Sequence, residues 1–410
     1  MTTTATATRQ TRRFEEKREL ILGAAASLFN RHGVRGTTLA DVAARVGLVT
    51  NSISYYYRRK EDLAAACALR AVETIADVAE RAAHAPDMAE RVRLFTRLYF
   101  DVLADIAAGR RAELLSSNDL RALEEPHAAT IFAAYTEMFR AIRRLLDGAG
   151  APDLERDDRN ARALLLVSVV HAAHNWIRRY EPEDFPRAAE RTADILLNGL
   201  SPSGAAFAPL DLGLDARVRP ASGDAADERF LRAASFMINE QGYRGASVDK
   251  ISARLSVTKG SFYHHNEHKD DLVAACFERT FALIRAAQFA AIEAAPDGWT
   301  RAASAANALV AFQLSSRGPL LRIAALAAMP EATRPAMVQQ LDRLLQRFVA
   351  IVSDGIADGS IRAVDARIAG QLLYMLTNSA AELHRWVPVD DPQEAARRFA
   401  RPLFTGLSRA

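Results

Sequence analysis

Apolar residues recur at helical spacing along almost the whole chain, and no stretch shows the period of two that is typical of a strand. The pattern therefore predicts an all-α protein. In the first half, helices are expected near residues 15–32, 39–46, 50–56, 61–84, 88–108, 112–121, 125–148, 157–180 and 185–199. In the second half, they are expected near residues 225–241, 248–255, 259–265, 270–294, 299–316, 319–328, 331–358, 363–386 and 392–407.

The two halves are copies of one another. Residues 33–67 align with residues 242–276 without a gap at an offset of 209, and twelve of the 35 aligned pairs are identical. The halves also end alike, in Gly-Leu-Ser at Ser201 and at Ser408. A repeat of this length indicates a duplicated domain rather than a solenoid.

Residues 39–56 are predicted to form two short helices with a tight turn between them. Thr38 precedes the first helix and Asp41 follows three positions later, which is the spacing of a capping box. Gly47 suits a left-handed turn because it has no Cβ atom. The second helix, residues 50–56, is polar on its outer face. This order predicts a helix-turn-helix, whose second helix enters the major groove of DNA.

The second copy repeats the motif. Ser247 stands at the capping position, and Ile251 and Leu255 face the expected core. Residues 259–265 form the second helix of this copy. The chain is therefore expected to present two DNA-reading heads.

The details of the motif resemble one family. After the turn, the second copy reads Val257-Thr258-Lys259-Gly260-Ser261-Phe262-Tyr263-His264-His265 and then Lys269-Asp270-Asp271-Leu272. The first copy matches the same pattern at Gly47, Tyr56, Tyr57, Lys60, Glu61 and Leu63. The pattern is similar to the amino-terminal domain of the TetR family of bacterial repressors. The resemblance implies two tandem TetR-like units, each with a three-helix head and a helical-bundle body that binds a ligand.

Both copies depart from the family pattern. Ser54 stands where the family usually has a tyrosine that touches phosphate, and Tyr55 is expected to substitute for it. In the second copy, Asn266 replaces a packing phenylalanine and Ser256 replaces the turn glycine. An alternative therefore stays open, in which only the first head binds DNA and the second half is a structural partner in a sensor or interaction protein.

The DNA-binding residues are predicted from residue type and place. Residues at the start of a recognition helix reach base edges, which selects Thr50, Asn51 and Ser52 in one head and Lys259, Gly260 and Ser261 in the other. Phosphate contacts, which position the protein without specifying sequence, are expected from Tyr55, Tyr56, Lys60, Tyr263, His265 and Lys269. The capping residues Thr38 and Ser247 and the adjacent His264 complete the set. Because the reading residues differ, the two half-sites should differ.

Charge is unevenly divided between the heads. Residues 9–60 carry eleven Lys and Arg against four Asp and Glu, a net charge of +7. Residues 218–269 carry eight against six, a net charge of +2. Local positive charge favours phosphate binding, so the first head is expected to dominate.

The domain boundaries follow from these patterns. Residues 1–14 are expected to be a basic flexible arm, and the Ser-, Pro- and Gly-rich residues 201–224 a linker. The heads and bodies are expected at residues 15–60, 61–200, 225–269 and 270–410. The resemblance implies that two family units pair through their last two helices. The halves are therefore expected to form an intramolecular pseudo-dimer, with a homodimer as the other option.

Chemistry other than binding finds little support. No phosphate loop, nucleophile elbow or zinc-protease motif is present, so an enzyme is not expected. Neither a metal nor another cofactor is expected. Cys67 and Cys276 occupy the same place in the repeat and are expected to be buried thiols, which suits a reduced cytoplasm.

The bodies could hold a small molecule between their helices. Apolar and aromatic side chains gather at helical spacing in the first body, where a few polar residues interrupt them. Helical bundles lined in this way bind small ligands. The predicted ligand contacts are Tyr99, Phe132, Tyr135, His171 and Asn175. The expected effector is a small hydrophobic or amphipathic molecule that releases the repressor from DNA.

Overall fold

The computed structural model describes residues 2–116, 125–202, 204–217, 225–255, 269–329 and 331–409. All regular structure within these ranges is helical, which confirms the predicted all-α fold. Among the described residues, no helix is long and apolar enough to cross a membrane.

The first half, over its described residues, contains a head of three α-helices and a body of five. The helices of the head are α1 (Thr2–His32), α2 (Leu39–Arg45) and α3 (Thr50–Tyr56), with a short 3₁₀ helix η1 (Val34–Gly36). The helices of the body are α4 (Lys60–Ala82), α5 (Met88–Ala107), α6 (His127–Arg144), α7 (Arg156–Trp176) and α8 (Phe185–Asn198), with 3₁₀ helices η3 (Ile177–Arg179) and η4 (Pro182–Asp184).

The second half follows the same order. The connecting segment contains the short helix α9 (Leu214–Arg217). The described part of the second head comprises α10 (Ala225–Gly245) and α11 (Val248–Leu255). The second body comprises α13 (Lys269–Ala294), α14 (Gly298–Leu314), α15 (Arg334–Asp358), α16 (Ala366–Ser379) and α17 (Pro392–Thr405), with 3₁₀ helices η5 (Ile323–Ala328) and η6 (Ala380–Arg385).

Several sequence-based expectations are wrong. The segment expected to be an arm, residues 1–14, is helical from Thr2 onward and continues α1, and it contains no Gly or Pro that would interrupt a helix. Residues 112–116 form no helix, and the rest of the helix expected at 112–121 lies outside the described residues. Only residues 323–328 of the expected helix 319–328 are helical, and they form the 3₁₀ helix η5. The expected helix 259–265 lies outside the described residues.

The linker is not a free tether over its described part. Leu212 and Leu214 are buried, and the N–H of Leu210 donates to Ser304 Oγ on α14 at 2.9 Å. Arg217 forms an ion pair with Glu293 on α13, at 3.3 Å. Residues 204–217 therefore lie against the second body. The two buried leucines account for the difference from the prediction.

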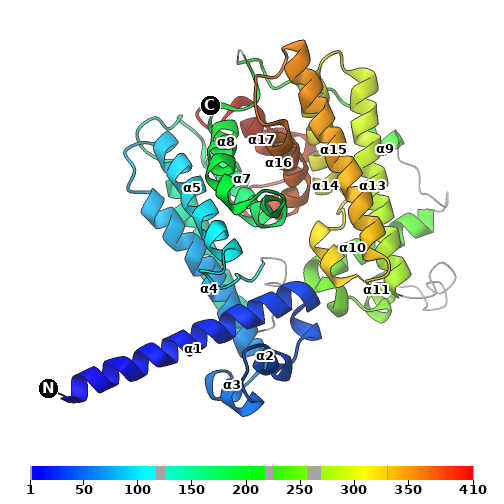
Figure 1. The fold of residues 1–410 in the computed structure, drawn as a ribbon. Helices are drawn as coiled ribbons and strands as arrows, with labels where there is room; N and C mark the ends of the chain where they lie inside the picture. Colours follow the sequence, from blue (N-terminus) through cyan, green and yellow to red (C-terminus); the bar gives the residue numbers. More distant parts are fainter. Residues whose placement is uncertain are drawn as a thin grey trace.

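The two halves lie side by side, with both heads at the same end of the molecule (Figure 1). Helices α4 and α13 lead from the heads into the bodies. Helices α7, α8, α16 and α17 gather in the middle, where α7 contacts both α16 and α17, and α8 contacts the same two helices.

The backbones of the two halves meet through reciprocal hydrogen bonds. Leu200 N donates to Phe404 O at 2.8 Å, and Leu407 N donates to Leu196 O at 2.8 Å. These bonds follow the ends of α8 and α17, which are the equivalent last helices of the two halves. The residue that follows the last helix of each half therefore donates a hydrogen bond to a carbonyl group at the end of the last helix of the other half.

Glycine makes this close approach possible. A Cβ atom on Gly199 would lie 2.2 Å from Phe404 O, and one on Gly406 would lie 2.4 Å from Leu197 O. Both glycines have positive φ, 69° and 93° respectively, a region that other residues rarely adopt. The two copies of the Gly-Leu-Ser sequence thus serve one contact.

Side chains extend the interface. Arg362 forms an ion pair with Asp194 at 2.7 Å, and Arg191 forms one with Asp365. The ring of Trp386 stacks on Phe139 of the first body, with centroids 3.6 Å apart and planes 5° from parallel. Aromatic stacking of this kind adds to the burial of apolar area.

The apolar core is continuous between the bodies but not into the first head. One cluster of buried residues runs from Val72 to Leu407 and includes both bodies and buried residues of the second head. The first head has a core of its own, built from Ile21, Leu22, Ala25, Ala26, Phe29, Val34, Val42, Ala43, Ile53, Tyr57, Leu63, Ala64, Ala65, Cys67 and Ala68, with Leu115 and Ile131 of the body packed on it. The first head thus packs on the start of α4 through a core that is separate from the large cluster.

Replacing Gly199 by Ala should destabilise the interface. The new methyl group meets a carbonyl oxygen and the backbone is strained, so we expect a loss of more than about 2 kcal/mol in the free energy of unfolding. Gly359→Ala is the matched control, because Gly359 also has positive φ (80°) but a Cβ there meets nothing within 4 Å. Thermal unfolding measures both. Equal losses for the two variants would contradict the contact.

Candidate nucleic-acid interface

Helices α2 and α3 form the expected helix-turn-helix in the first head. Asp41 N donates to Thr38 Oγ1 at 3.1 Å, and Thr38 N donates to Asp41 Oδ2 at 2.8 Å, which completes the predicted capping box. Hydrogen bonds from Thr38 hold the pKa of Asp41 below its usual value. Gly47 has a φ of 67° in the turn. Ile53 is fully buried and anchors α3.

The predicted base-reading residues lie at the exposed start of α3. Thr50 and Asn51 are exposed, and Ser52 is half-buried. Ile53 is the buried residue of this helix, so the core does not depend on these three side chains. The start of α3 is therefore free to enter a groove.

An aromatic cluster covers the end of α3. Tyr55 is 77% exposed, whereas Tyr56 is half-buried beneath Phe14 of α1, with ring centroids 4.8 Å apart. Tyr57 is buried and accepts a hydrogen bond from Arg18 Nε at 3.2 Å, and burial raises its pKa. The hydroxyl of Tyr55 is thus the more accessible one for a phosphate.

Positive charge follows directly after the cluster. Arg58 and Arg59 are exposed, and Lys60 opens α4 and is half-buried. Arg59 N donates to Asp62 Oδ2 at 3.1 Å, which caps α4. His127 Nε2 of α6 lies 3.0 Å from Asp62 Oδ1, so the same carboxylate joins the start of α4 to α6.

The second head is described only in part. Lys250 N donates to Ser247 Oγ at 3.2 Å at the start of α11, where Ser247 takes the place of Thr38. Lys269 is the first residue of α13. The other predicted contacts of this head lie outside the described residues: Lys259, Gly260, Ser261, Tyr263, His264 and His265.

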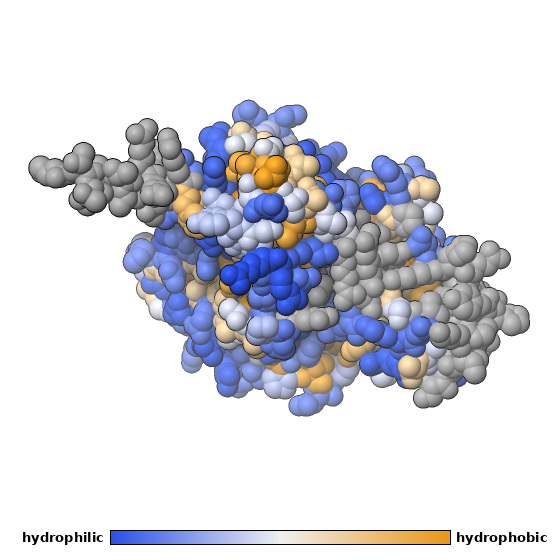
Figure 2. Space-filling view, turned by 90° about the horizontal axis from the view of Figure 1, so that it is seen from below, coloured by the Kyte–Doolittle hydropathy of each residue, from blue (hydrophilic) through white to orange (hydrophobic). Residues whose placement is uncertain are grey.

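The end of the molecule that carries the heads is largely hydrophilic. Figure 2 shows it from below, with hydrophilic residues over the middle of the face and smaller hydrophobic areas among them. Tyr55 and Val49 are exposed on the described part of the first head. This face is the one that a DNA duplex would meet.

The first head is tied to its body by side-chain bonds to the segment 112–116. Asn30 Nδ2 of α1 donates to Leu114 O at 2.9 Å, and Ser116 N donates to Asn30 Oδ1 at 2.9 Å. Arg70 of α4 pairs with Glu19 of α1 at 2.9 Å and also donates to the carbonyl just before Leu114. Asn30 and Arg70 form hydrogen bonds with backbone groups of this segment, which therefore do not depend on the hydrogen bonds of the predicted helix.

The same bonds recur in the second half. Asn239 Nδ2 donates to Leu320 O at 2.8 Å, and Arg322 N donates to Asn239 Oδ1 at 3.0 Å. Arg279 pairs with Glu228 at 2.7 Å and donates to the carbonyl just before Leu320 at 3.1 Å. Both copies thus link the first helix of the head to the body in one way. Sequence reasoning missed this link, although the identical residues at an offset of 209 could have indicated it.

The two cysteines behave as predicted. Cys67 and Cys276 are buried and unpaired with one another, and each thiol lies near a carbonyl of the head's first helix, Leu22 O at 3.5 Å and Leu231 O at 3.6 Å. Burial raises the pKa of both thiols to about 12. They pack the heads rather than react.

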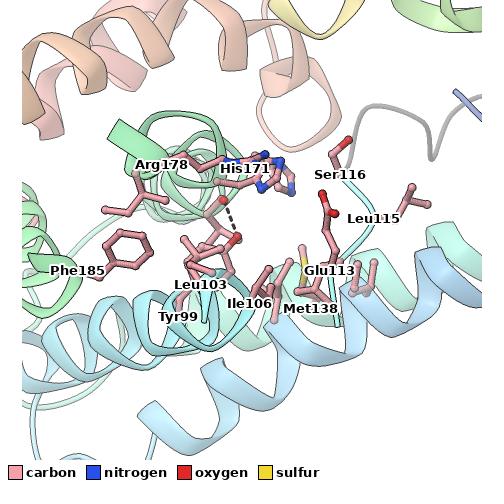
Figure 3. A pocket seen from close by; sticks show the side chains of 18 of the residues that line it. Tyr99, Leu103, Ile106, Glu113, Leu115, Ser116, Met138, His171, Arg178 and Phe185 are labelled. Carbon is pink, nitrogen blue, oxygen red and sulfur yellow. Dashed lines mark hydrogen bonds between the residues drawn. The ribbon is translucent and has the colours of Figure 1, made fainter. Parts of the chain in front are cut away.

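The first body encloses a cavity of about 270 Å³ (Figure 3). It lies between α4, α5, α6, α7 and the segment 113–116. Three of the predicted ligand contacts line it, namely Tyr99, Tyr135 and His171. Two do not: Phe132 is 53% exposed and Asn175 is also exposed, because their positions on α6 and α7 turn away from the cavity.

The cavity is mostly apolar, and polar groups line it from more than one wall. In Figure 3, Glu113 and Ser116 come from one wall and His171 from another, while Ile106 and Met138 lie on the helices below them. The Tyr99 hydroxyl is already used, since it donates to Val170 O at 2.9 Å. The pattern predicted neither Glu113, which lies outside the expected aromatic cluster, nor the neighbouring His174 and Arg178.

The part of the cavity around His171 and His174 is buried and lies next to the second half. Burial lowers the pKa of His174, which keeps the imidazole neutral near pH 7. Tyr135 stacks on His171, with centroids 6.0 Å apart, and on Trp386 of the second half, at 6.4 Å. The cavity therefore borders both the head linkage and the interface between the halves.

The chain matches known proteins over both heads. The model of bacterial regulatory proteins of the tetR family matches residues 21–67 and 230–276. The chain is 37% identical over 59 residues to the Transposon Tn10 TetC protein of Escherichia coli, a match that spans 14% of this chain but only 30% of TetC. It is 25% identical over 189 residues to the HTH-type transcriptional activator FasR of Mycolicibacterium smegmatis, covering 46% of this chain and 84% of FasR.

Two solved structures are also similar. One is the TetR family transcriptional regulator PfmR from Thermus thermophilus, with 19% identity, a TM-score of 0.35, and coverage of 44% of this chain and 95% of PfmR. The other is apo AibR, with 19% identity, a TM-score of 0.36, and coverage of 44% of this chain and 99% of AibR.

Replacing Thr38 by Ala should destabilise the first head. The variant loses the N-cap of α2, which costs about 1 kcal/mol in comparable helices. The hydrogen bonds to Asp41 stabilise the fold above pH 3.8, the ordinary pKa of the carboxyl, and are lost as the pH falls through its lowered pKa. The matched variant Ser247→Ala removes the cap of α11. Urea unfolding followed by circular dichroism measures both, and an unchanged midpoint for Thr38→Ala would contradict the capping role.

Proposed function

Because this chain belongs to the TetR family of bacterial regulatory proteins, whose members are DNA-binding transcriptional regulators and not enzymes, we propose that it is a ligand-responsive repressor with both heads in one chain. The observation that carries the proposal is the segment 113–116. It lines the cavity of the first body and is bonded to Asn30 and Arg70 of the head linkage. The protein acts in the cytoplasm, where its operator lies.

The two heads read different half-sites of one operator. Thr50, Asn51 and Ser52 face the bases from the first head, and asparagine suits adenine. Lys259 and Ser261 take these positions in the second head, and lysine suits guanine. The operator is therefore an imperfect or non-palindromic pair of half-sites, about one helical turn or a multiple apart.

The halves act as an intramolecular pseudo-dimer. Packing of α7 and α8 against α16 and α17, with the close contact at Gly199, supports this arrangement. A single chain then sets the spacing of its two heads without a partner. A second copy is not required for operator binding.

A small, mostly apolar effector with one or two hydrogen-bonding groups binds in the first cavity. Tyr135, His171 and Glu113 are its nearest polar partners, and Phe132 and Asn175 are not among them. The effector displaces the segment 113–116, and Asn30 passes this displacement to α1. It changes DNA affinity only by its differential affinity for the two positions of the head.

The direction of regulation is the finer part of the proposal. Repression fits a regulator that is released from DNA by its effector. FasR, which is similar to this chain, is described as an activator. A promoter–reporter assay in cells with and without the gene separates the two, because a repressor lowers reporter output and an activator raises it.

The alternative is a protein in which only the first head binds DNA. The net charge of +7 on residues 9–60 against +2 on residues 218–269 favours it. The second head retains the reading pattern at Tyr263, His265 and Lys269, which favours two active heads. Inactivating one head at a time distinguishes the two proposals.

The first head should contribute more to DNA affinity than the second. Lys60→Ala with Tyr55→Phe should weaken binding in gel shifts more than Lys269→Ala with Tyr263→Phe, which changes the corresponding lysine and a nearby tyrosine of the second head. The salt dependence of the binding constant should fall by about one for each lost phosphate contact. A greater loss from the second pair would overturn the charge argument, and no loss from it would favour the single-head alternative.

Ligands found by a thermal-shift screen of fatty, aromatic and drug-like compounds should weaken operator binding. Asn30→Ala should keep the thermal shift but lose most of the effect on DNA, because it cuts the bonds to residues 114 and 116. Asn239→Ala, which cuts the equivalent bonds in the second half, is the matched control. Ligands that stabilise the protein and leave DNA affinity unchanged would overturn the switch.

A further inference from the structure

We propose that the chain binds one effector, in the first body only, because side chains of the second body fill the equivalent space. This rests on the proposed ligand-responsive function and assigns its sensing to one half. The second half then acts as a fixed frame that positions its own head.

The equivalent space can be located from the repeat itself. Helices α4 and α13 correspond at the offset of 209, and the bonds of Asn30 and Asn239 place Leu114 and Leu320 at the same point. Near the end of the penultimate helix of each half, Trp176 corresponds to Trp386. The space at this point in the second body measures about 10 Å³, against about 270 Å³ in the first. It is no larger than one water molecule requires.

Larger residues on α13 close one side. Thr280 stands where α4 has Ala71, and Phe281 stands where it has Val72. Ala71 and Val72 both line the first cavity. Phe281 is 1% exposed, and Thr280 Oγ1 accepts a hydrogen bond from the backbone N–H of the residue after Leu320, at 2.9 Å. The wall that is open in the first body is thus packed in the second.

Arg322 lines the other side and is held there by an ion pair. Arg322 stands where the first body has Ser116, and Glu382 stands where it has Ala172. The two side chains meet at 2.8 Å and are 17% and 13% exposed. Arg385 adds a second contact to Glu382 at 3.3 Å. A pair this shielded is screened little by salt and is costly to break by removing one partner.

The packing of the two heads also differs between the halves, which supports the same proposal. The core of the first head, which includes residues of α4 such as Leu63 and Cys67, is separate from the cluster that spans both bodies. Buried residues of the second head, such as Ile238 and Ile251, belong to the core shared by both bodies. The open cavity therefore lies in the half whose head core is separate from the large cluster, and the filled one in the half whose head belongs to that cluster.

The test exchanges residues between the two copies. N-phenyl-1-naphthylamine, a neutral aromatic probe whose fluorescence rises in apolar sites, is titrated against the full chain, and the number bound is measured by calorimetry. The wild type should bind one molecule per chain. Ala71→Thr with Val72→Phe, which installs the residues of the second body, should lose this binding.

The reciprocal variant should gain a site. Arg322→Ser with Glu382→Ala and Phe281→Val installs the residues of the first body and should bind two molecules per chain. Circular dichroism establishes that each variant is folded. If the opened variant does not fold, the closing variant alone decides, because binding that survives Ala71→Thr with Val72→Phe overturns the proposal.

Two further outcomes also overturn it: two molecules bound by the wild type, or none. Neither readout uses DNA. A chain that binds one probe but no operator would therefore refute the proposed regulation and leave the single sensing site standing. A chain that binds its operator but takes up two probes would do the reverse.

Discussion

The close contact between the last helices of the two halves is the constraint on which the rest of the structure depends. Gly199 and Gly406 let two backbones approach so closely that a methyl group on either would overlap a carbonyl oxygen. The reciprocal bonds of Leu200 and Leu407 follow from that approach. This contact fixes the bodies in one frame, and the apolar core runs across it without a break.

Each head is joined to its body by the same set of side-chain hydrogen bonds, which occurs once in each half. Asn30 and Asn239, with Arg70 and Arg279, join the first helix of each head to an irregular segment of its body. The linkage is symmetric, but its surroundings are not. In the first half the segment borders a cavity of about 270 Å³, whereas in the second Thr280 and Arg322 line a space of only about 10 Å³. A duplicated chain can diverge in this way, because each copy mutates separately and both remain joined.

Much of the fold could be predicted from sequence, because helical periodicity, the Thr38 cap and the turn at Gly47 are local signals. The irregular segments at residues 112–116 and 319–322 could not, since side chains distant in sequence satisfy their backbone groups. The same limit applied to the site. Exposure on α3 follows from the local pattern, whereas Phe132 and Asn175 were misplaced because apolar spacing alone does not say which face of a helix borders a cavity.

The central claim is that one chain supplies both DNA-reading heads. Native mass spectrometry of the protein with an operator duplex obtained by selection tests it most directly. The account predicts a complex of one chain with one duplex, whose selected sequence has two unlike half-sites. A complex that forms only with two chains on a perfect palindrome would contradict it.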